Sequence, residues 1–396
     1  MCSPKSLLHR FGLLFLVVVA VLVAIQPAVA QFRFGPRETK PLDWRFVGPQ
    51  GNRVSAVVSD SNDMNVYYAG ACAGGVWKSD DGGTNWRPIF DDQTSQSIGS
   101  LAIAPSDSNQ IWAGTGEAFI RSNVLIGDGI YKSMDAGETW QNMGLEKTGC
   151  IGRTIVHPRD PDTVFACAVG TAYGPQKERG VFKTTDGGKN WDHVLFADED
   201  TGCSGLAMDP NNPRIMFAGM WSIEIKTWGK FSGGPGGGVY VSRDGGDTWN
   251  KIEGHGLPEF EVGKVDVIVA PSNSKRVYAL IETGDRGSLW RSDDGGFNWR
   301  VVSHHRGINE RPHYYTRMVV APDDEDTVYF PCNRMHVSRD GGQTIEPFSG
   351  GGDNHDMWAD PKNPERMMIG NDGGISITTT RGRQWKRVVL PIGQMY

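Results

Sequence analysis

Three acidic side chains stand in segments where a pair of carboxylates could cleave a glycosidic bond. They are Glu117 in TGEAFIR, Asp356 in DNHDMW and Asp372 in GNDGG. Glycoside hydrolysis needs two carboxyl groups about 5 to 10 Å apart across the sugar, with the pKa of one raised so that it can donate a proton. The catalytic hypothesis is therefore Glu117 together with Asp356 or Asp372, and it depends on a fold that brings these carboxylates together.

Aromatic and histidine side chains are concentrated in the long connecting segments 219–238, 304–317 and 349–358. Flat rings supply apolar platforms for sugars or peptides, and nearby polar groups fix the orientation of the ligand. The predicted ligand-binding residues are Trp221, Trp228, His313, Tyr314, Tyr315 and His355. The alternative for each is structural, because tyrosines also pack beneath loops and Glu117 can cap backbone N–H groups.

Other chemistries find no support in the residue pattern. The histidines at 304–305 and in NHD at 354–356 lack a third ligand at metal-site spacing. No nucleophile-elbow serine and no His-Glu-x-x-His motif occurs. The glycine-rich SGGPGGG at 232–238 precedes an expected strand rather than a helix, so it does not match a phosphate-binding loop. We therefore expect no metal and no cofactor.

A further set of aspartates recurs at a fixed spacing. The pattern Ser/Thr-x-Asp-x-Gly-x-x-Trp begins as SDDGGTNW at 79–86 and returns at intervals of 40 to 58 residues. The last two copies are decayed, with Ile345 in place of the tryptophan and Thr380 in place of the aspartate. One chain rarely needs so many copies of a catalyst, whereas aspartate and glycine at fixed offsets are what tight turns require. The predicted structural aspartates are Asp81, Asp135, Asp186, Asp244, Asp294 and Asp340.

The same repeats predict the fold. In the third repeat, short strands are expected at 153–158, 162–170, 180–188 and 190–196, which makes each unit a four-stranded meander. Seven meanders in tandem favour an all-β β-propeller of about seven four-stranded blades over a sandwich, since radial repetition protects the sheet edges. The Asp-box then lies at the hairpin between the third and fourth strands. The catalytic and ligand-binding candidates gather at the opposite end of the blades, which we call the loop face.

The N-terminus has the features of a secretory signal. Lys5 and Arg10 precede an apolar run at 11–25, and AVA at 28–30 supplies small residues for cleavage. The alternative is an uncleaved anchor. We expect a secreted or periplasmic protein without stable membrane insertion after cleavage, with a signal peptide at 1–30, a linker at 31–42 and the propeller at 43–396.

Charge argues against a nucleic-acid partner. Without Lys5 and Arg10, 38 basic residues face 46 acidic ones, a net charge of about −8. No stripe of lysine and arginine is then available to neutralise phosphates.

Five cysteines remain once Cys2 is removed with the signal, and an odd number cannot pair completely. Cys150 and Cys203 occupy equivalent places in successive repeats, which allows one bridge between neighbouring units. Buried free thiols are the favoured alternative, also for this pair.

The ends of the chain leave ring closure open. DWRFVGP at 43–49 resembles the strand that follows a box, which gives eight such strands for seven sets of the other three. Either this strand closes the ring as a clasp and displaces the late WKRVVL, or the ring has a further blade. LPIGQMY at 390–396 resembles the start of another inner strand, so an incomplete ring or the N-terminal part of a longer chain is the alternative.

The boxes and their surroundings also resemble a known family. GGVWKSDDGGTNW, GDGIYKSMDAGETW and GNDGGISI are similar to secreted bacterial sortilin-like, BNR (Asp-box) repeat propellers, which are often labelled glycosyl hydrolase. The resemblance covers nearly everything after residue 40. The chain departs from two groups of hydrolytic propellers: WRFVGPQGNRVSAV lacks the Arg-Ile-Pro segment of sialidases, and Cys72 stands where xyloglucan-hydrolysing propellers carry a first-blade aspartate.

The sequence therefore predicts a recognition module that binds an extracellular glycan, peptide or protein through its loop face. The alternative is a glycoside hydrolase that uses a carboxylate pair on the same face. A structural remnant without activity is the third hypothesis.

Overall fold

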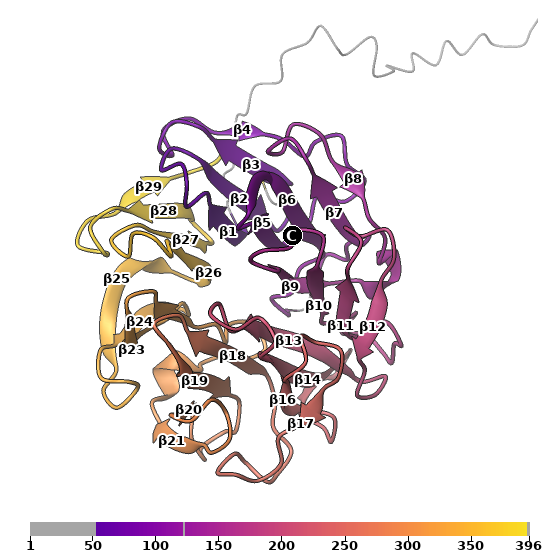
Figure 1. Ribbon diagram of the computed structural model, residues 1–396, viewed down its shortest axis with the longest axis vertical. Helices are drawn as coiled ribbons and strands as arrows, with labels where there is room; N and C mark the ends of the chain where they lie inside the picture. Colours follow the sequence, from indigo (N-terminus) through magenta and orange to yellow (C-terminus); the bar gives the residue numbers. More distant parts are fainter. Residues whose placement is uncertain (1–52, 122, 394–396) are drawn as a thin grey trace, which may run out of the picture. The chain divides into compact units, whose positions relative to one another are not determined.

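Each Asp-box repeat folds as one antiparallel sheet. The computed structural model describes residues 53–121 and 123–393, which form seven antiparallel sheets whose main strands follow chain order (Figure 1). The inner strands of successive sheets contact one another, and β1 also contacts β26 and β27 of the last sheet. The described residues thus form an all-β β-propeller of seven four-stranded blades, and the predicted strands of the third repeat are confirmed as β9 to β12.

The first sheet contains β1 (Val54–Ser59), β2 (Tyr67–Ala71), β3 (Val76–Ser79) and β4 (Arg87–Pro88). The second contains β5 (Ile98–Ala104), β6 (Asp107–Thr115), β7 (Ile130–Ser133) and β8 (Gln141–Asn142). The third contains β9 (Ile151–Val156), β10 (Val164–Ala168), β11 (Gly180–Thr184) and β12 (Asp192–Leu195). The fourth contains β13 (Thr201–Met208), β14 (Met216–Lys226), β16 (Gly238–Ser242) and β17 (Asn250–Lys251), with β15 (Gly229–Ser232) paired to the extended end of β14.

The fifth sheet contains β18 (Val265–Ala270), β19 (Asn273–Ile281), β20 (Leu289–Ser292) and β21 (Arg300–Ser303). The sixth contains β22 (Val319–Ala321), β23 (Asp324–Phe330), β24 (Arg334–Ser338) and β25 (Glu346–Gly352). The seventh contains β26 (Asn354–Ala359), β27 (Met367–Asn371), β28 (Gly374–Thr378) and β29 (Lys386–Val388). Two single turns of 3₁₀ helix lie in connectors, η1 (Glu146–Thr148) and η2 (Arg306–Ile308).

Apolar side chains fill the spaces between neighbouring sheets. Between the first and second sheets, Ala56 and Tyr68 pack with Ile98 and Ile111, all of them buried. Burying one large aliphatic side chain stabilises the fold by about 1.5–3 kcal/mol. Outer strands such as β4 and β8 are short and exposed, so the core lies between the sheets and toward the inner strands.

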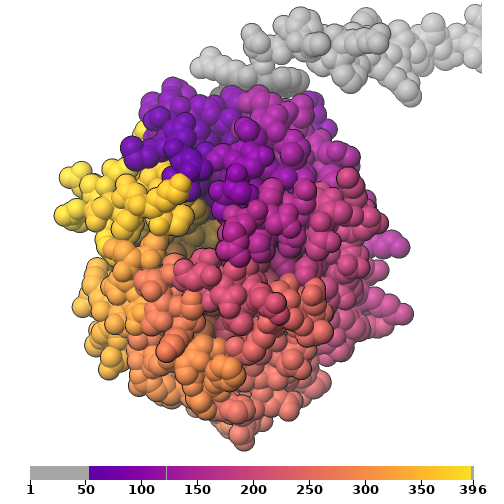
Figure 2. Space-filling model, in the orientation of Figure 1, coloured from indigo at the N-terminus to yellow at the C-terminus, as the bar shows by residue number. Residues whose placement is uncertain are grey.

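The inner strands surround a central cavity of about 340 Å³, whose lining includes residues of β9, β13, β18, β22 and β26. The space-filling view shows one face hollowed near its centre, beside the yellow seventh sheet (Figure 2). The charged side chains of Arg153 and Asp266 stand among this lining.

The box aspartates are held inside their own hairpins. Asp81 Oδ1 accepts hydrogen bonds from the backbone N–H groups of Thr84 (2.9 Å) and Asn85 (2.8 Å), and the Asn85 amide donates to Oδ2 (2.7 Å). Gly83 has φ +76°, and a Cβ there would lie 2.4 Å from Ile377 of the seventh sheet. The backbone N–H and side chain of Asn85 lower the pKa of Asp81 to about 2. This geometry ties the carboxylate to the turn.

Box tryptophans connect neighbouring sheets. Trp140 Nε1 donates to Gly137 O of its own turn (3.1 Å) and to Ile89 O beyond the first sheet (2.8 Å). Trp191 Nε1 donates in the same way to Met143 O (2.8 Å). These box tryptophans therefore stabilise both their own turn and the contact with the neighbouring blade.

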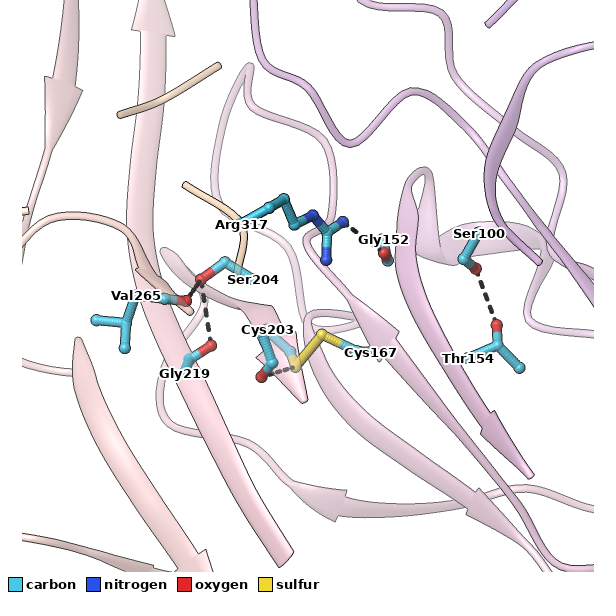
Figure 3. The surroundings of a disulfide bond; sticks show 10 residues. Ser100, Gly152, Thr154, Cys167, Cys203, Ser204, Gly219, Val265 and Arg317 are labelled. Atoms are coloured by element: carbon cyan, nitrogen blue, oxygen red, sulfur yellow. Dashed lines mark hydrogen bonds between the residues drawn. A yellow bond between two sulfur atoms is a disulfide. The ribbon is translucent and has the colours of Figure 1, made fainter. Parts of the chain in front are cut away.

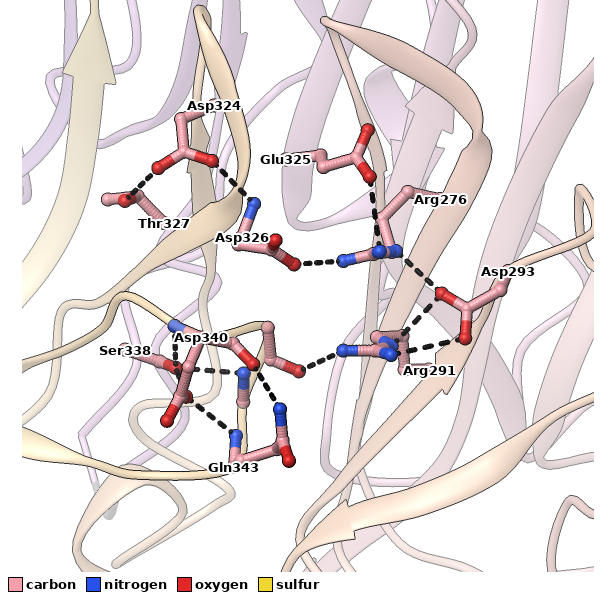
Figure 4. Close-up of polar contacts among 12 residues, drawn as sticks. Arg276, Arg291, Asp293, Asp324, Glu325, Asp326, Thr327, Ser338, Asp340 and Gln343 are labelled. Carbon is pink, nitrogen blue, oxygen red and sulfur yellow. Dashed lines mark hydrogen bonds and ion pairs between the residues drawn. The ribbon is translucent and has the colours of Figure 1, made fainter.

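The two decayed boxes keep part of this network. Thr380 Oγ1 accepts the backbone N–H of Gln384 (3.0 Å), which replaces one acceptor of the missing aspartate. The sixth box, without its tryptophan, lies beside an ionic network in which Arg276 binds Asp293 (2.7 Å) and Glu325 (3.1 Å) (Figure 4). Arg291 completes the link by donating to Gly341 O (3.0 Å). Ionic contacts thus join the fifth and sixth sheets.

Acid should weaken the fold through these boxes. A carboxylate with a depressed folded-state pKa stabilises the fold above its ordinary pKa, and that contribution is lost as pH falls toward the folded-state pKa. Hydrogen bonds from Asn190 lower the pKa of Asp186 to about 2, from an ordinary value of 3.8. We expect the melting temperature, followed by circular dichroism, to fall between about pH 4 and pH 2. In Asp186→Asn the melting temperature should fall less over this pH range than in the wild type, whereas in Asp192→Asn it should fall as much as in the wild type. An equal fall in both variants would refute a stabilising role of the box carboxylate.

The bridge that the repeats allow between Cys150 and Cys203 is not formed, and free thiols, the favoured alternative, are found at Cys150 but not at Cys203. Cys203 on β13 is bonded to Cys167 on β10, with 5.1 Å between their Cα atoms (Figure 3). Cys72, Cys150 and Cys332 are free and buried. Cys150 lies just before β9, whereas Cys203 on β13 packs with Cys167 on β10 in one core cluster. The bridge therefore joins the third and fourth sheets.

The predicted signal peptide, the linker and the strand expected at 43–49 lie outside the described residues. Within the part of the chain that is described, no helix has the length and apolar character needed to cross a membrane.

Candidate functional site

Packed side chains close the centre of the loop face. The segment after β6 meets the segment before β22, where Ile120 N donates to His313 O (3.2 Å). The ring of Phe119 lies 6.2 Å from that of Tyr314 and 4.9 Å from that of His355. Tyr315 is fully buried in the same cluster. We call Phe119, Tyr314, Tyr315 and His355 the aromatic plug.

An ionic network lies against the aromatic plug. Glu117 is fully buried and pairs with Arg53 and with Arg121 (3.0 Å). Arg53 Nε lies 3.5 Å from Asp372 Oδ1, and the same oxygen lies 3.2 Å from His355 Nε2. The structure thus brings Glu117 and Asp372 around one guanidinium group. Since Glu117 has no exposed surface, a substrate has no access to its carboxylate.

Asp372 is more accessible, with 42% of its side chain exposed. Burial by itself raises the pKa of Asp372, but the hydrogen bond and charge of His355, with the charge of Arg53, outweigh it and lower the pKa. A carboxyl group with a lowered pKa suits a stabilising or nucleophilic role and not that of a general acid.

Asp356 belongs to a different pair. Its Oδ1 lies 3.0 Å from Arg153 Nη1, and its Oδ2 accepts the backbone N–H of Val57 (3.1 Å). Arg317, which is nearly fully buried, donates to Gly152 O (2.7 Å) beside this pair. Asp356 therefore links opposite inner strands, β26 and β9, and is held by a cation other than the one that binds Glu117.

Backbone strain is concentrated around the aromatic plug. Arg311 (φ +46°), Thr316 (φ +70°) and Asp353 (φ +52°) adopt left-handed conformations that side chains with a Cβ rarely take. The Tyr315 hydroxyl donates to Asp353, and the Arg311 guanidinium lies 4.8 Å from the ring centre of Tyr314. Such strain costs about 1–3 kcal/mol per residue and is typical of functional sites.

The two predicted tryptophans have different environments. Trp221 is fully buried, and its Nε1 donates to Ser232 Oγ (2.8 Å), so it supports the hairpin formed by β14 and β15. Trp228 is at the turn of that hairpin and is 78% exposed, while Phe231 is 50% exposed. The Lys226 ammonium lies 5.9 Å from the Trp228 ring and 5.6 Å from the Phe231 ring. The hairpin therefore presents two aromatic rings to solvent on the loop face.

An open polar pocket of about 370 Å³ adjoins this hairpin. Its walls are the loop 282–288 between β19 and β20 and the connector 304–312. Glu282 Oε2 accepts hydrogen bonds from Ser232 Oγ (2.5 Å) and from Lys264 N (2.8 Å), which fixes the pocket against the end of β15. The polar side chains in its lining include Glu282, Asp285, His304, Asn309 and Glu310.

Glu282 and Glu310 are not among the site residues predicted from the sequence. Loop 282–288 is short and carries no aromatic residue, so it lacks the features that mark the longer segments as candidate sites. Glu310 lies within the long connecting segment 304–317, where the predicted ligand-binding residues are the neighbouring histidine and tyrosines. Its position in the connector after the fourth strand of a repeat, which leads to the loop face, is the feature of the sequence that could have identified it.

Two groups close to the pocket have lowered pKa values: Lys264, which is buried and whose backbone N–H donates to Glu282, and His313, which is half-buried and follows Pro312 of the lining. Burial and the charge of Arg317 lower the pKa of Lys264 to about 7, and its ammonium donates to Tyr315 O (2.7 Å). Burial, with Lys230, Lys264 and Arg311 nearby, lowers the pKa of His313 to about 4. His313 is therefore neutral at neutral pH. Over residues 53–121 and 123–393, no three His, Cys, Asp or Glu side chains are placed to hold a metal ion.

Two family models match this chain. Residues 74–218 match the Sortilin-Vps10 model, described as sortilin, neurotensin receptor 3, and residues 240–251 match the BNR/Asp-box repeat. These matches support a sortilin-like, BNR/Asp-box propeller family for the chain. The second match includes the box tryptophan Trp249, in the repeat whose extra hairpin carries Trp228.

Curated relatives of this chain are xyloglucanases. That of Paenibacillus sp is 24% identical over 321 residues, covering 71% of this chain and 30% of the relative. Xgh74A of Acetivibrio thermocellus is 24% identical over 314 residues, covering 73% of this chain and 30% of the relative. The chain thus spans about a third of the length of these relatives, whose names favour the glycoside-hydrolase alternative over the recognition-module hypothesis.

Solved structures share the fold. A GH74 xyloglucanase from Xanthomonas campestris has a TM-score of 0.59 at 16% identity, over 86% of this chain and 54% of that chain. YCF48 bound to D1 peptide has a TM-score of 0.52 at 15% identity, over 85% of this chain and 97% of that chain. At these identities the likeness establishes the propeller alone.

Proposed function

We propose that the loop face of this sortilin-like propeller binds a β-glucan of the xyloglucan class. The observation that carries the proposal is the exposed pair of rings, Trp228 and Phe231, on a hairpin that borders a polar pocket. Sugar rings present apolar C–H faces to aromatic side chains, and their hydroxyl groups bind carboxylates and amides. The xyloglucanase relatives supply the class of glycan.

The hairpin and the pocket form one continuous surface. Ser232 ends β15 and hydrogen-bonds to Glu282, the first residue of the pocket loop. A glucan stacked on Trp228 and Phe231 therefore extends toward Glu282 and Asn309. The aromatic plug and the Glu117 network lie behind this surface and position the segments that form it.

Hydrolysis by this chain is the second candidate, because its curated relatives are xyloglucanases. Of the three predicted carboxylates, Asp372 alone has an exposed side chain. Glu282 and Glu310 line one pocket and are the other carboxylates that a bound glucan would reach. Their joint position makes Glu282→Gln and Glu310→Gln the variants that test turnover.

Removing the exposed ring should weaken glucan binding without affecting the fold. Trp228→Ala removes a stacking platform worth about 1–2 kcal/mol, so we expect the Kd for a xyloglucan oligosaccharide to rise about 5- to 30-fold. Isothermal titration calorimetry measures the change. Phe297→Ala is the matched control, since Phe297 is 57% exposed but lies in a box turn at the opposite end of the blades. Equal affinity of wild type and Trp228→Ala would exclude the hairpin as the binding surface.

A further inference from the structure

A second pocket lies between the fourth and fifth sheets, on the side of the loop face. Its volume is about 530 Å³, within the range of sites for small organic ligands. One wall is the glycine-rich segment 234–238 before β16, and the other is the connector 252–262 after β17. No residue of the polar pocket described above takes part in its lining.

The floor of this pocket is apolar. Its lining contains Val239, Leu257, Val262 and Ile281, which are buried, and Ile252, which packs against them in the same core cluster. The pocket therefore opens directly onto the hydrophobic core between two sheets. Such a floor suits an aliphatic or sugar-ring body and not a fully polar ligand.

The rim of the pocket is acidic. Glu253, Glu259 and Glu261 line it, and all three are exposed. None of them has an ion-pair partner within residues 53–121 and 123–393, although other surface carboxylates, such as Glu346 with Arg339 (2.8 Å), do. The lining has one basic residue, Lys251, whose ammonium donates to Pro235 O (2.6 Å). The rim thus carries an excess of negative charge.

The aromatic residue of the pocket already holds a cation on one face. The Arg286 guanidinium lies 4.5 Å from the centre of the Phe260 ring, and this ring is 37% exposed. Aromatic faces attract guanidinium and ammonium groups through the ring quadrupole. Because Arg286 occupies this ring face, the rim glutamates are the groups left to pair with a bound cation.

We propose that this pocket binds an organic cation on an apolar body, such as a guanidinium or ammonium group carried by an aliphatic stem or a sugar ring. The stem covers the apolar floor while the charge meets Glu259 and Glu261 at the rim. Both a basic side chain of an extracellular peptide and an amino sugar have this chemistry. The site shares no lining residue with the polar pocket of the proposed glucan surface. A neutral glucan also has no charge that could pair with this rim.

The test uses two pairs of probes, each with a cationic and a neutral member, titrated into the full chain at low salt. The pairs are acetyl-Leu-Arg-amide with acetyl-Leu-Gln-amide, and the fully deacetylated glucosamine trimer with cellotriose. We expect at least one cationic member to bind at least 10-fold more tightly than its neutral counterpart. Whether the peptide, the amino sugar or both bind then assigns the source of the ligand. Equal affinity within both pairs, or no binding by either cationic probe, would overturn the proposal.

Charge variants locate the site. The double variant Glu259→Gln/Glu261→Gln should weaken binding of the cationic probe about 3- to 30-fold, because two exposed charge pairs are lost. Glu146→Gln, at an exposed glutamate elsewhere that likewise has no ion pair within the described residues, should leave the affinity unchanged. Trp228→Ala should also leave it unchanged, which separates this proposal from the glucan-binding one. Unaltered affinity of the double variant would overturn the assignment to this pocket.

Discussion

Glu117→Gln should lower the free energy of unfolding by about 3–5 kcal/mol. The substitution keeps the shape of the side chain but removes the charge that Arg53 and Arg121 share in a fully buried position. Arg53 then keeps only its longer contact with Asp372 (3.5 Å), and a buried charge that has lost its main partner is more costly than the loss of a surface pair. Urea unfolding followed by tryptophan fluorescence measures the change.

The same variant separates structure from catalysis. A structural Glu117 predicts that Asp372→Asn, whose side chain is more exposed, destabilises the fold less than Glu117→Gln does. A catalytic Glu117 would instead leave stability unchanged and abolish turnover of a glucan. That second pattern would contradict the placement of Glu117 behind the aromatic plug.

Removal of the disulfide is expected to lower the melting temperature by about 5–10 °C. Cys167 and Cys203 are 36 residues apart, and closing a loop of that length in the unfolded chain corresponds to about 4 kcal/mol in the chain-entropy model. The double variant Cys167→Ala/Cys203→Ala removes the bridge that joins the third and fourth sheets. Differential scanning calorimetry with and without a reductant measures the effect.

The control for the disulfide is Cys150→Ala, because Cys150 is an equally buried thiol without a bridge. Its loss should cost about 1 kcal/mol, as for a small cavity. Addition of reductant should lower the melting temperature of the wild type and of Cys150→Ala, and have no effect on the double variant. A reductant effect of the same size in the double variant would exclude this bridge as the cause.

The parts of the fold that depend on short-range chemistry could be predicted from the sequence. The hydrogen bonds of Asp81 reach only to Ser79, Thr84 and Asn85, so all the groups that form the turn stand within eight consecutive residues. The order of strands within each sheet follows from this local repetition. Seven boxes predict about seven blades, and the contact of β1 with the last sheet agrees with that number.

The site depends on contacts that spacing along the chain does not show. Arg53 pairs with Glu117, which is 64 residues further along the chain. The Tyr314 hydroxyl lies 3.0 Å from Nε2 of His355, which is 41 residues away. Nothing in the sequence distinguishes Trp221 from Trp228, although the first is buried under the hairpin and the second is exposed at its turn. Cys203 likewise pairs with Cys167 because of the direction of its side chain on β13. Equivalent positions in successive repeats do not reveal that direction.

The most direct test of the proposed function is a titration of the full chain with xyloglucan oligosaccharides, with reducing ends measured in the same samples. The proposal predicts saturable binding that is weakened by Trp228→Ala and retained in Phe297→Ala. Release of reducing ends that is lost in Glu282→Gln or Glu310→Gln would add hydrolysis to binding. No binding of any xyloglucan or other β-glucan oligosaccharide by the folded chain would contradict the assignment of the loop face to glycans.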